Sequence, residues 1–386
     1  MTAVVSNPRG AWPFRYEMMD GLRGIAALIV VMHHLLIVSG GHYAVMMFFV
    51  ISGYCIAAST ESCRRNGVSF GAFMRRRLHR IYPPYFFAIV FYFLNRLAKV
   101  ALGRDNDLHR PLLDWIQNLT MTQWVSLLFE PQAEAARNPK LLVAAFWSLN
   151  YEEQFYLVMG LALLLAAYRR VTIPTVVIGL AIAGFMWNCL WPGGWVTGLF
   201  IEYWVHFALG ATLFYVLSLH ADRAARTAFL GFAVALLLLC ACKIFPWEAD
   251  TFLHNRVFAE LGAAGAFALL LFFLRPYSAA ISRHWLWKPI AALGVISYSL
   301  YLVHQFNLVV ATALVDRMAP GAWQPARSAL TVAVEIAIGA VFWYLCERPF
   351  LNRSPLRPSP AAGEHVEELA RVSERIPAGE SAAHRL

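Results

Sequence analysis

Ten apolar stretches, each long enough to cross a lipid bilayer, constrain the fold of this chain more than any other feature. A membrane-spanning helix needs about 20 mostly apolar residues, because the hydrocarbon core is about 30 Å thick. The chain is 59% hydrophobic and only 14% charged, which is far from the composition of a soluble domain. We therefore predict an all-α, polytopic membrane protein with about ten transmembrane helices. The expected spans are residues 21–39, 44–60, 83–102, 147–168, 173–191, 196–217, 227–245, 257–274, 288–315 and 328–346.

Membrane topology explains the net charge of +9 better than nucleic-acid binding does. Lys and Arg accumulate on the cytoplasmic side of membrane proteins, and placing the N-terminus inside puts most basic residues on that side. Both termini are therefore predicted to be cytoplasmic. No cleavage site follows the first apolar run, so the first helix is expected to stay in the protein. The expected parts are a cytoplasmic N-terminal segment (1–17), a membrane domain (18–353) and a disordered cytoplasmic tail (354–386).

Arg23 and His34 form the first candidate constellation, inside the first apolar run. The eleven residue steps between them return a helix to within roughly 20° of its starting direction and rise roughly 16 Å. The two side chains therefore share one face, and His34 lies near the middle of the bilayer if Arg23 lies at one surface. Asp20 is three residues before Arg23 and close enough to pair with it.

His34 is preferred over His33 as the catalytic residue, because His33 points about 80° away from the Arg23 direction. Imidazole accepts a proton near neutral pH, and an ionisable group at mid-membrane indicates function. The alternative is a histidine that is hydrogen-bonded inside the helix bundle and only holds it together.

A basic segment before the third span carries a second constellation. Arg77 and Arg80 are three residues apart, so on a helix they project to the same side, with Arg76 beside them. Planar guanidinium groups suit phosphate oxygens, and we predict that these arginines bind a phosphate-rich cosubstrate at the cytoplasmic surface. The alternative is an ordinary positive-inside anchor. Glu347, at the end of the last span, is expected at the same surface.

The fourth expected helix begins with a polar stripe. Ser148, Glu152 and Tyr156 follow one another at intervals of four residues along one side, with Trp147 at the membrane interface. A carboxylate is costly to bury in a membrane, so we assign Glu152 a catalytic role. It is expected to face His34, fix its tautomer and steady the positive charge gained in the reaction. The other three side chains are candidates for substrate binding.

Two further groups of polar residues lie inside later spans. Glu202 and His206 are four residues apart in the sixth span. They either belong to the substrate site or form a buried pair that only holds helices together. In the ninth span, Ser297, Tyr301 and His304 follow at i, i+4 and i+7, so they form a second polar line facing inward. Tyr301 and His304 are candidates for substrate binding. The six cysteines lack metal-ligand spacing, and no metal site is predicted.

In their order and topology, these pieces resemble the integral-membrane acyltransferase-3 family, whose members O-acetylate bacterial surface polysaccharides, Nod factors and some macrolides. The resemblance covers nearly the whole membrane region. The matching pieces are D-G-L-R-G-I-A-A-L with R-x10-H, F-F-V-I-S-G-Y, R-L-H-R-I-Y-P, W-S-L-N-Y-E-E-Q-F-Y, S-Y-S-L-Y-L-V-H and E-R-P.

The resemblance implies acyl transfer, first of all of acetyl, from cytoplasmic acyl-CoA to a hydroxyl on the other side of the bacterial inner membrane. It implies acyl-CoA as a cosubstrate and no tightly bound cofactor. By position, His34 corresponds to the essential histidine of the family and Arg23 to its partner. Arg77 and Arg80 correspond to the pair linked to donor binding, and Glu152 to the carboxylate of the W-S-L-x-x-E stretch. Many members carry an additional hydrolase-like domain, and a stand-alone form is expected here.

Several alternatives stay open at this point. His34 acts either as a base for direct transfer or as the carrier of a covalent acyl group. The acceptor is expected to be a sugar of a surface or lipid-linked glycan, with a secreted small molecule as the second choice, and the acyl chain can be longer than acetyl. A transporter is the rival from another class, because polar residues at mid-membrane also mark transport routes. An assembly factor with degenerate motifs is the third. The bilayer is an expected partner, nucleic acid is not, and the oligomeric state is open.

Overall fold

The computed structural model describes residues 16–101, 111–129, 141–168, 171–190, 198–219, 223–244 and 252–351. Within these ranges the chain is helical and contains no strand, which confirms the all-α prediction for them. The α-helices are α1 (Met19–His34), α2 (Gly41–Arg65), α3 (Phe70–Ala101), α4 (Leu112–Thr120), α5 (Gln123–Phe129), α7 (Trp147–Tyr168), α8 (Ile173–Leu190), α9 (Trp204–Ser218), α10 (Arg223–Ile244), α11 (Phe252–Leu274), α12 (Ser278–Arg283), α13 (Trp287–Val295), α14 (Ser297–Met318) and α15 (Gln324–Phe342). The short turns are the 3₁₀ segments η1 (Ala144–Phe146), η2 (Phe200–Glu202), η4 (Arg275–Tyr277) and η6 (Arg348–Phe350), and the π-helical η5 (Trp343–Glu347).

Each of the ten expected spans overlaps at least one of these helices. Among the described residues, six helices are long and apolar enough to cross a membrane. They are Gly41–Arg65, Ile173–Leu190, Arg223–Lys243, Arg256–Arg283, Ser297–Met318 and Gln324–Phe350. The chain is therefore a multi-pass membrane protein. The predicted tail at 354–386 lies outside the described residues, as does most of the predicted N-terminal segment.

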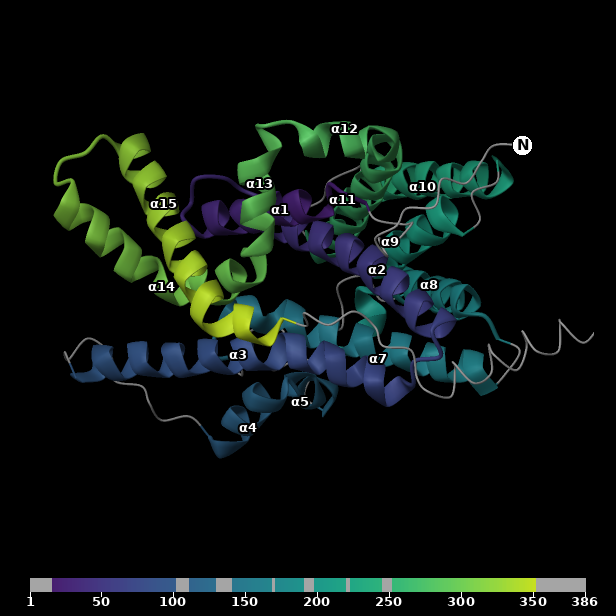
Figure 1. The fold of residues 1–386 in the computed structure, drawn as a ribbon, viewed down its shortest axis with the longest axis horizontal. Coiled ribbons are helices and arrows are strands. Elements are labelled where there is room, and N and C mark those ends of the chain that lie inside the picture. The colour runs from purple at the N-terminus through teal and green to yellow at the C-terminus, as the bar shows by residue number, and fades with distance from the viewer. Residues whose placement is uncertain are drawn as a thin grey trace, which may run out of the picture.

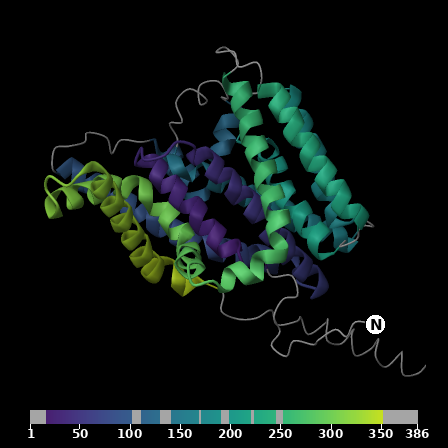
Figure 2. The same ribbon diagram turned by 90° about the horizontal axis from the view of Figure 1, so that it is seen from above.

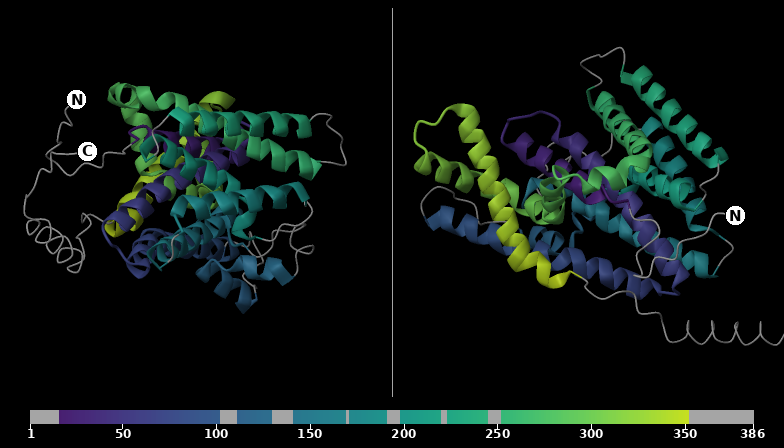
Figure 3. Two further views of the ribbon diagram at one scale, coloured as in Figure 1. Left: turned by 90° about the vertical axis from the view of Figure 1, so that its right-hand side faces the viewer. Right: turned by 45° about the horizontal axis from the view of Figure 1, so that its top comes forward.

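Helices α1 and α2 run through the middle of the bundle. Helices α14 and α15 lie on one side of them and α8 to α11 on the other (Figures 1 and 2). Helix α3 runs along one face and packs on α7, with α4 and α5 beyond it (Figure 1). Helices α10 and α11 pack against each other as a pair at one end (Figure 3). Helix α1 contacts α2, α13 and α14, so its polar residues face several neighbours at once.

Two glycines allow α2 and α9 to touch through their backbones. A Cβ atom on Gly53 would lie 1.9 Å from the carbonyl oxygen of Phe207. A Cβ on Gly210 would lie 1.8 Å from that of Val50. Such approaches are possible only without a side chain, as in small-residue contacts between membrane helices. The F-F-V-I-S-G-Y piece therefore contributes to packing through Gly53.

Gly210→Ala is expected to lower the stability of the bundle by about 1–3 kcal/mol, because α2 and α9 must move apart to admit the methyl group. Thermal unfolding in detergent micelles measures this loss. The matched control is Gly231→Ala in α10, where no heavy atom lies within 4 Å of the added Cβ. That change is expected to be neutral or stabilising, because alanine favours helix more than glycine does. Equal unfolding temperatures in the two variants would contradict the packing role of Gly210.

The expected span at 288–315 is divided into two helices. Helix α13 ends at Val295 and α14 begins at Ser297, whose hydroxyl donates to the carbonyl oxygen of Gly294 at 2.8 Å. A Cβ on Gly294 would lie 1.7 Å from the backbone oxygen of Asp20, so α13 packs directly on the start of α1. Because of this division, α13 can pack along α1 while α14 points in a different direction and packs against α15.

The expected span at 196–217 is also not one helix. In the described part, the 3₁₀ turn η2 comes first, and α9 begins only at Trp204. Its 15 residues rise about 22 Å, which is less than the thickness of the hydrocarbon core.

Candidate active site

His34, the last residue of α1, is held by two polar contacts. Its Nδ1 lies 3.0 Å from the carbonyl oxygen of Val30 and 3.3 Å from Nε2 of His304 on α14. Nδ1 of His304 in turn lies 2.8 Å from the carbonyl oxygen of Tyr301. The two imidazole rings are 4.9 Å apart between centroids and meet edge to face.

These contacts determine the neutral tautomers of both rings. A carbonyl oxygen only accepts, so His304 carries its proton on Nδ1 and donates it to Tyr301. Nε2 of His304 is then an acceptor, and the Nδ1–H of His34 points to it and to Val30. The lone pair of His34 is thus on Nε2, which has no hydrogen-bond partner within the described ranges. His34 can take up a proton at Nε2 and keep its Nδ1–H contacts.

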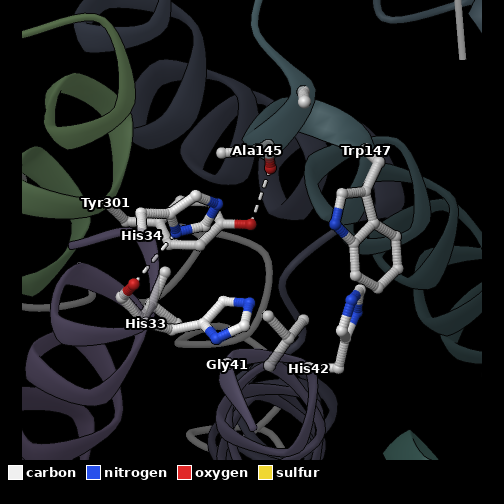
Figure 4. A pocket seen from close by; sticks show the side chains of 10 residues that line it. His33, His34, Gly41, His42, Ala145, Trp147 and Tyr301 are labelled. Atoms are coloured by element: carbon white, nitrogen blue, oxygen red, sulfur yellow. Dashed lines mark hydrogen bonds between the residues drawn. The ribbon is translucent and has the colours of Figure 1, made fainter. Parts of the chain in front are cut away.

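His34 lines a cavity of about 150 Å³, which we call the outer cavity (Figure 4). In this view, His34 and Tyr301 lie on one side, Trp147 and His42 lie on the other, and His33 lies below and between them. The cavity is completed by Val30, Gly41, Val45, Ala144 and Ala145.

A second cavity of about 40 Å³, the inner cavity, adjoins the first, because Val45 and Tyr301 line both. The hydroxyl of Tyr301 donates to the carbonyl oxygen of Ala145 at 2.6 Å and lies 2.7 Å from Oγ of Ser148, so this shared wall is held in place. The polar lining of the inner cavity consists of Arg23, Ser52, Ser148, Glu152, Ser297, Tyr298 and Tyr301. Arg23 and His34 therefore line neighbouring cavities. The side of α14 that faces α1 and these cavities carries Ser297, Tyr301 and His304.

Three half-buried guanidinium groups gather on the inner side of these cavities. Arg23 of α1 and Arg77 and Arg80 of α3 all act electrostatically on the thiol of Cys55. None of the three makes a hydrogen bond or an ion pair with another residue in the described ranges. Arg76 lies with Arg77 near Cys63. We call Arg23, Arg77 and Arg80 the arginine cluster.

The arginine cluster differs from a nearby basic pair at the end of α2. There, Arg64 and Arg65 both contact the carboxylate of Glu61, at 2.8 and 2.7 Å, so one of their two positive charges is compensated. The guanidinium of Arg77 instead lies over the ring of Tyr156, 5.6 Å from its centroid. An aromatic face stabilises a cation without neutralising it, so the cluster retains positive charge for an anion.

Glu152 faces the inner cavity and not His34. Its Oε1 accepts a hydrogen bond from the Tyr156 hydroxyl at 2.6 Å and lies 3.5 Å from Oγ of Ser52. The expected contact between Glu152 and His34 is not formed, because His304 occupies the position beside Nδ1 of His34. The tautomer of His34 is held by an imidazole and a backbone carbonyl in place of a carboxylate.

Three other candidates lie away from His34. Asp20 is exposed and forms no ion pair with Arg23 within the described ranges, so the expected pairing is not made. Glu202 ends η2 and accepts a hydrogen bond from the hydroxyl of Tyr151 at 2.6 Å. His206 is buried in α9, and its ring nitrogens have no partner in the described part of the chain. The Glu202–His206 pair, one of the two alternatives, is therefore not formed, and neither residue lines the outer or the inner cavity.

His33 and His42 are residues of the outer cavity that the helix geometry did not single out. The sequence feature that indicates them is a pair of glycines, Gly40 and Gly41, with His33 and His34 before it and His42 after it. Gly40 has a φ of 98°, and a Cβ on Gly41 would lie 2.5 Å from Cδ2 of His33. The turn needs glycine at both positions, and it brings the start of α2 back onto the end of α1.

Glu347 is buried among its neighbours inside the bundle. Helix α15 ends at Phe342, and the π-helical turn η5 carries Glu347 inward. The Ser299 hydroxyl donates to its carboxylate at 2.5 Å, and Arg23 and Arg80 attract it electrostatically. Glu347 thus lies behind the arginine cluster without pairing directly with it.

The fold and this site define a multi-pass membrane protein with a histidine-lined pocket beside a cationic cluster. The chain belongs to the acyltransferase-3 family, described as the Acyltransferase domain, because residues 16–345 match it.

Two relatives show the same likeness. The chain is 28% identical over 352 residues to "Putative membrane-bound transacylase BcsY" of Komagataeibacter xylinus, covering 89% of this chain and 85% of that protein. It is 26% identical over 356 residues to "Putative peptidoglycan O-acetyltransferase YrhL" of Bacillus subtilis strain 168. That match covers 86% of this chain and 54% of YrhL, so the chain spans about half the length of that relative. No solved structure matches.

Proposed function

We propose that this protein transfers an acyl group, first of all acetyl, from acyl-CoA to a hydroxyl of a sugar in a surface or lipid-linked glycan. The observation that carries the proposal is the free Nε2 lone pair of His34 in a cavity that adjoins the arginine side of the bundle. Membership of an acyltransferase family supports acyl transfer. A relative named as an O-acetyltransferase supports a hydroxyl acceptor.

The proposal includes an orientation in the bacterial inner membrane. About ten helices cross it, both termini are cytoplasmic, and the arginine cluster faces the cytoplasm, as the positive-inside rule requires. Acyl-CoA then arrives from the cytoplasm and the acceptor from the opposite side. His34 stands between them, because the outer and inner cavities meet at Tyr301.

The donor is held by charge and reaches His34 through its thin arm. In this scheme, Arg77 and Arg80 bind the phosphates of acyl-CoA, with Arg76 and Arg23 adding positive charge. The pantetheine arm follows the inner cavity past Glu152 and brings the thioester to the Tyr301 wall. Trp147 lines the acceptor side of the outer cavity.

The chemical step uses the free nitrogen of His34. The acceptor oxygen attacks the thioester carbonyl carbon while its proton moves to Nε2, and the new C–O bond replaces the C–S bond. The thiolate of CoA leaves and takes the proton from the imidazolium. During the step, the Nδ1–H contacts to His304 and Val30 stabilise the positive charge on His34. The same lone pair would carry the acyl group in a two-step route, and mass spectrometry of acid-quenched protein distinguishes the routes by an acyl adduct on His34.

The test compares cells with and without the gene by mass spectrometry of surface glycans and secreted metabolites. An acyl ester that disappears with the gene is the expected result. Proteoliposomes holding the purified protein and acetyl-CoA are then expected to acylate the molecule identified. Movement of that molecule across the membrane without acylation would indicate a transporter and end the proposal.

The partner of His34 gives a further prediction. His304→Leu is expected to lower kcat by about 10–100-fold, because the tautomer of His34 and its charged form lose their support. His304→Gln keeps an acceptor oxygen and is expected to lose less than about tenfold, with KM for acyl-CoA unchanged in both variants. Initial rates in proteoliposomes measure these values. Equal losses in the two variants would indicate that His304 only fills space.

A further inference from the structure

Arg256 on α11 connects a buried carboxylate to the outer cavity. Its Nε contacts Oε1 of Glu260 at 2.8 Å, and its Nη2 lies 3.0 Å from Nδ1 of His42. Glu260 is buried and also accepts a hydrogen bond from the hydroxyl of Tyr203 at 3.4 Å. One guanidinium therefore uses two of its nitrogens to tie His42 to the bundle.

This contact determines the hydrogen-bonding character of His42. Arginine is always a donor, so Nδ1 of His42 must accept, and the proton of the neutral ring is on Nε2. Nδ1 of His33 lies 3.3 Å from the carbonyl oxygen of Val38, so His33 donates there and its Nε2 is an acceptor. His34 also presents an acceptor nitrogen. His42 is thus the one donor among the three histidines that line the outer cavity.

We propose that the Nε2–H of His42 binds an oxygen of the acceptor next to the hydroxyl that His34 deprotonates, and that Arg256 is a positioning residue for His42. The inference rests on the proposed function and deepens it. One alcohol oxygen gives its proton to His34 while a neighbouring oxygen accepts from His42. The site therefore favours acceptors with two adjacent hydroxyls, such as a pyranose ring, over simple alcohols.

The position of His42 assigns it to the acceptor and not to the thioester. His42 lines the outer cavity but not the inner one, which adjoins Arg23. It lies beside Trp147, whose flat apolar face suits the C–H side of a sugar ring (Figure 4). The ring of Tyr203, tied to Glu260, lies 5.4 Å from that of Trp147 between centroids. The Arg256–Glu260 ion pair thus supports both side chains.

The volume of the outer cavity agrees with a single ring. A cavity of about 150 Å³ holds one six-membered ring such as benzene. Unlike an engineered apolar cavity of that size, the outer cavity has polar walls: its three histidines offer two acceptor nitrogens and one donor, and the indole N–H of Trp147 offers a second donor. That pattern matches neighbouring hydroxyls on a six-membered ring.

The experiment uses small probes in place of the natural acceptor. Purified protein in proteoliposomes receives acetyl-CoA with either trans-cyclohexane-1,2-diol or cyclohexanol, and thiol release is followed. For the wild-type protein, kcat/KM is expected to be about tenfold higher with the diol than with cyclohexanol. A factor of about ten is the most that one additional hydrogen bond contributes. His42→Ala and Arg256→Lys are expected to reduce this ratio to about one. The lysine keeps the charge opposite Glu260 but cannot contact both partners, so the bundle is preserved.

The matched control is Arg327→Lys, which changes another ion-paired arginine, bound to Asp316 at 2.6 Å. It is expected to keep the wild-type ratio. Equal use of the two alcohols by the wild-type protein overturns the proposal, as does a preserved ratio in His42→Ala. Restoration of the preference in His42→Gln, which carries an amide N–H, would confirm the donor role. Absence of any thiol release in the wild-type protein would instead contradict the proposed function itself.

Discussion

His34→Ala is expected to lower acyl transfer by about 10²–10⁴-fold, because the imidazole that removes the acceptor proton in the proposed mechanism is lost together with its supporting contacts to His304 and Val30. The effect is expected on kcat, since the arginine cluster that we propose as the donor site is untouched. His34→Gln keeps a polar side chain and is expected to be equally inactive. Acyl transfer in proteoliposomes, normalised to the amount of protein in the membrane, measures both.

The neighbouring His33 is the matched control. It lines the same cavity, but its Nδ1 contacts the carbonyl oxygen of Val38 and not a nitrogen of another histidine. His33→Ala is therefore expected to lose less than about tenfold. Normal turnover in His34→Ala, or a larger loss in His33→Ala, would move the base to another residue.

Arg77→Ala combined with Arg80→Ala is expected to weaken acyl-CoA binding at least about 100-fold. Each charge-assisted contact to a phosphate contributes about 1.5–3 kcal/mol, and neither guanidinium group forms an ion pair with a carboxylate among the residues that the structure describes. Isothermal titration of the detergent-solubilised protein with acetyl-CoA measures the affinity. Acetyl-pantetheine, which lacks the phosphates, is expected to react equally well with both proteins.

Arg64→Ala combined with Arg65→Ala is the control for general loss of positive charge. These arginines lie at the end of α2 and are already paired with Glu61. Their removal is expected to leave the affinity for acetyl-CoA unchanged. If the two double variants behaved alike, the arginine cluster would be a topological anchor and no binding site.

Helix positions and the faces of single helices could be predicted from the sequence. The apolar stretches are long, so their helices were found, and 147–168 matches α7 residue for residue. Spacing alone placed Ser297, Tyr301 and His304 on one side of α14. The period of a helix determines which residues share a face, whatever the rest of the chain does.

The neighbour across each face could not be predicted. The sequence predicted Glu152 as the partner of His34 and His304 as a substrate-binding residue, but the packing of α14 on α1 places His304 beside His34. Hydropathy also does not locate where a helix begins. Glu202 lies in a 3₁₀ turn before α9 begins, and its carboxylate accepts a hydrogen bond from Tyr151. Glu202 and His206 therefore do not meet, because an i, i+4 pair requires both residues to lie in one unbroken α-helix.

The histidines of the outer cavity show the same limit. His42 follows a turn, and helical periodicity says nothing about the direction of the chain beyond a glycine with positive φ. Arg256 is more than two hundred residues from His42 in sequence, and no local pattern connects them.

The wall that Tyr301 forms between the two cavities has a consequence for how an acyl group can cross this protein. Its hydroxyl is tethered to Ser148 and Ala145, so the opening beside it is expected to stay narrow. In the proposed scheme, the bulky nucleotide of acyl-CoA then stays on the arginine side while its pantetheine arm extends past Tyr301, and the acceptor lies in the outer cavity. The acyl group would then cross the membrane because the pantetheine arm is long enough to reach the outer cavity. The protein would not need to alternate between inward-open and outward-open states.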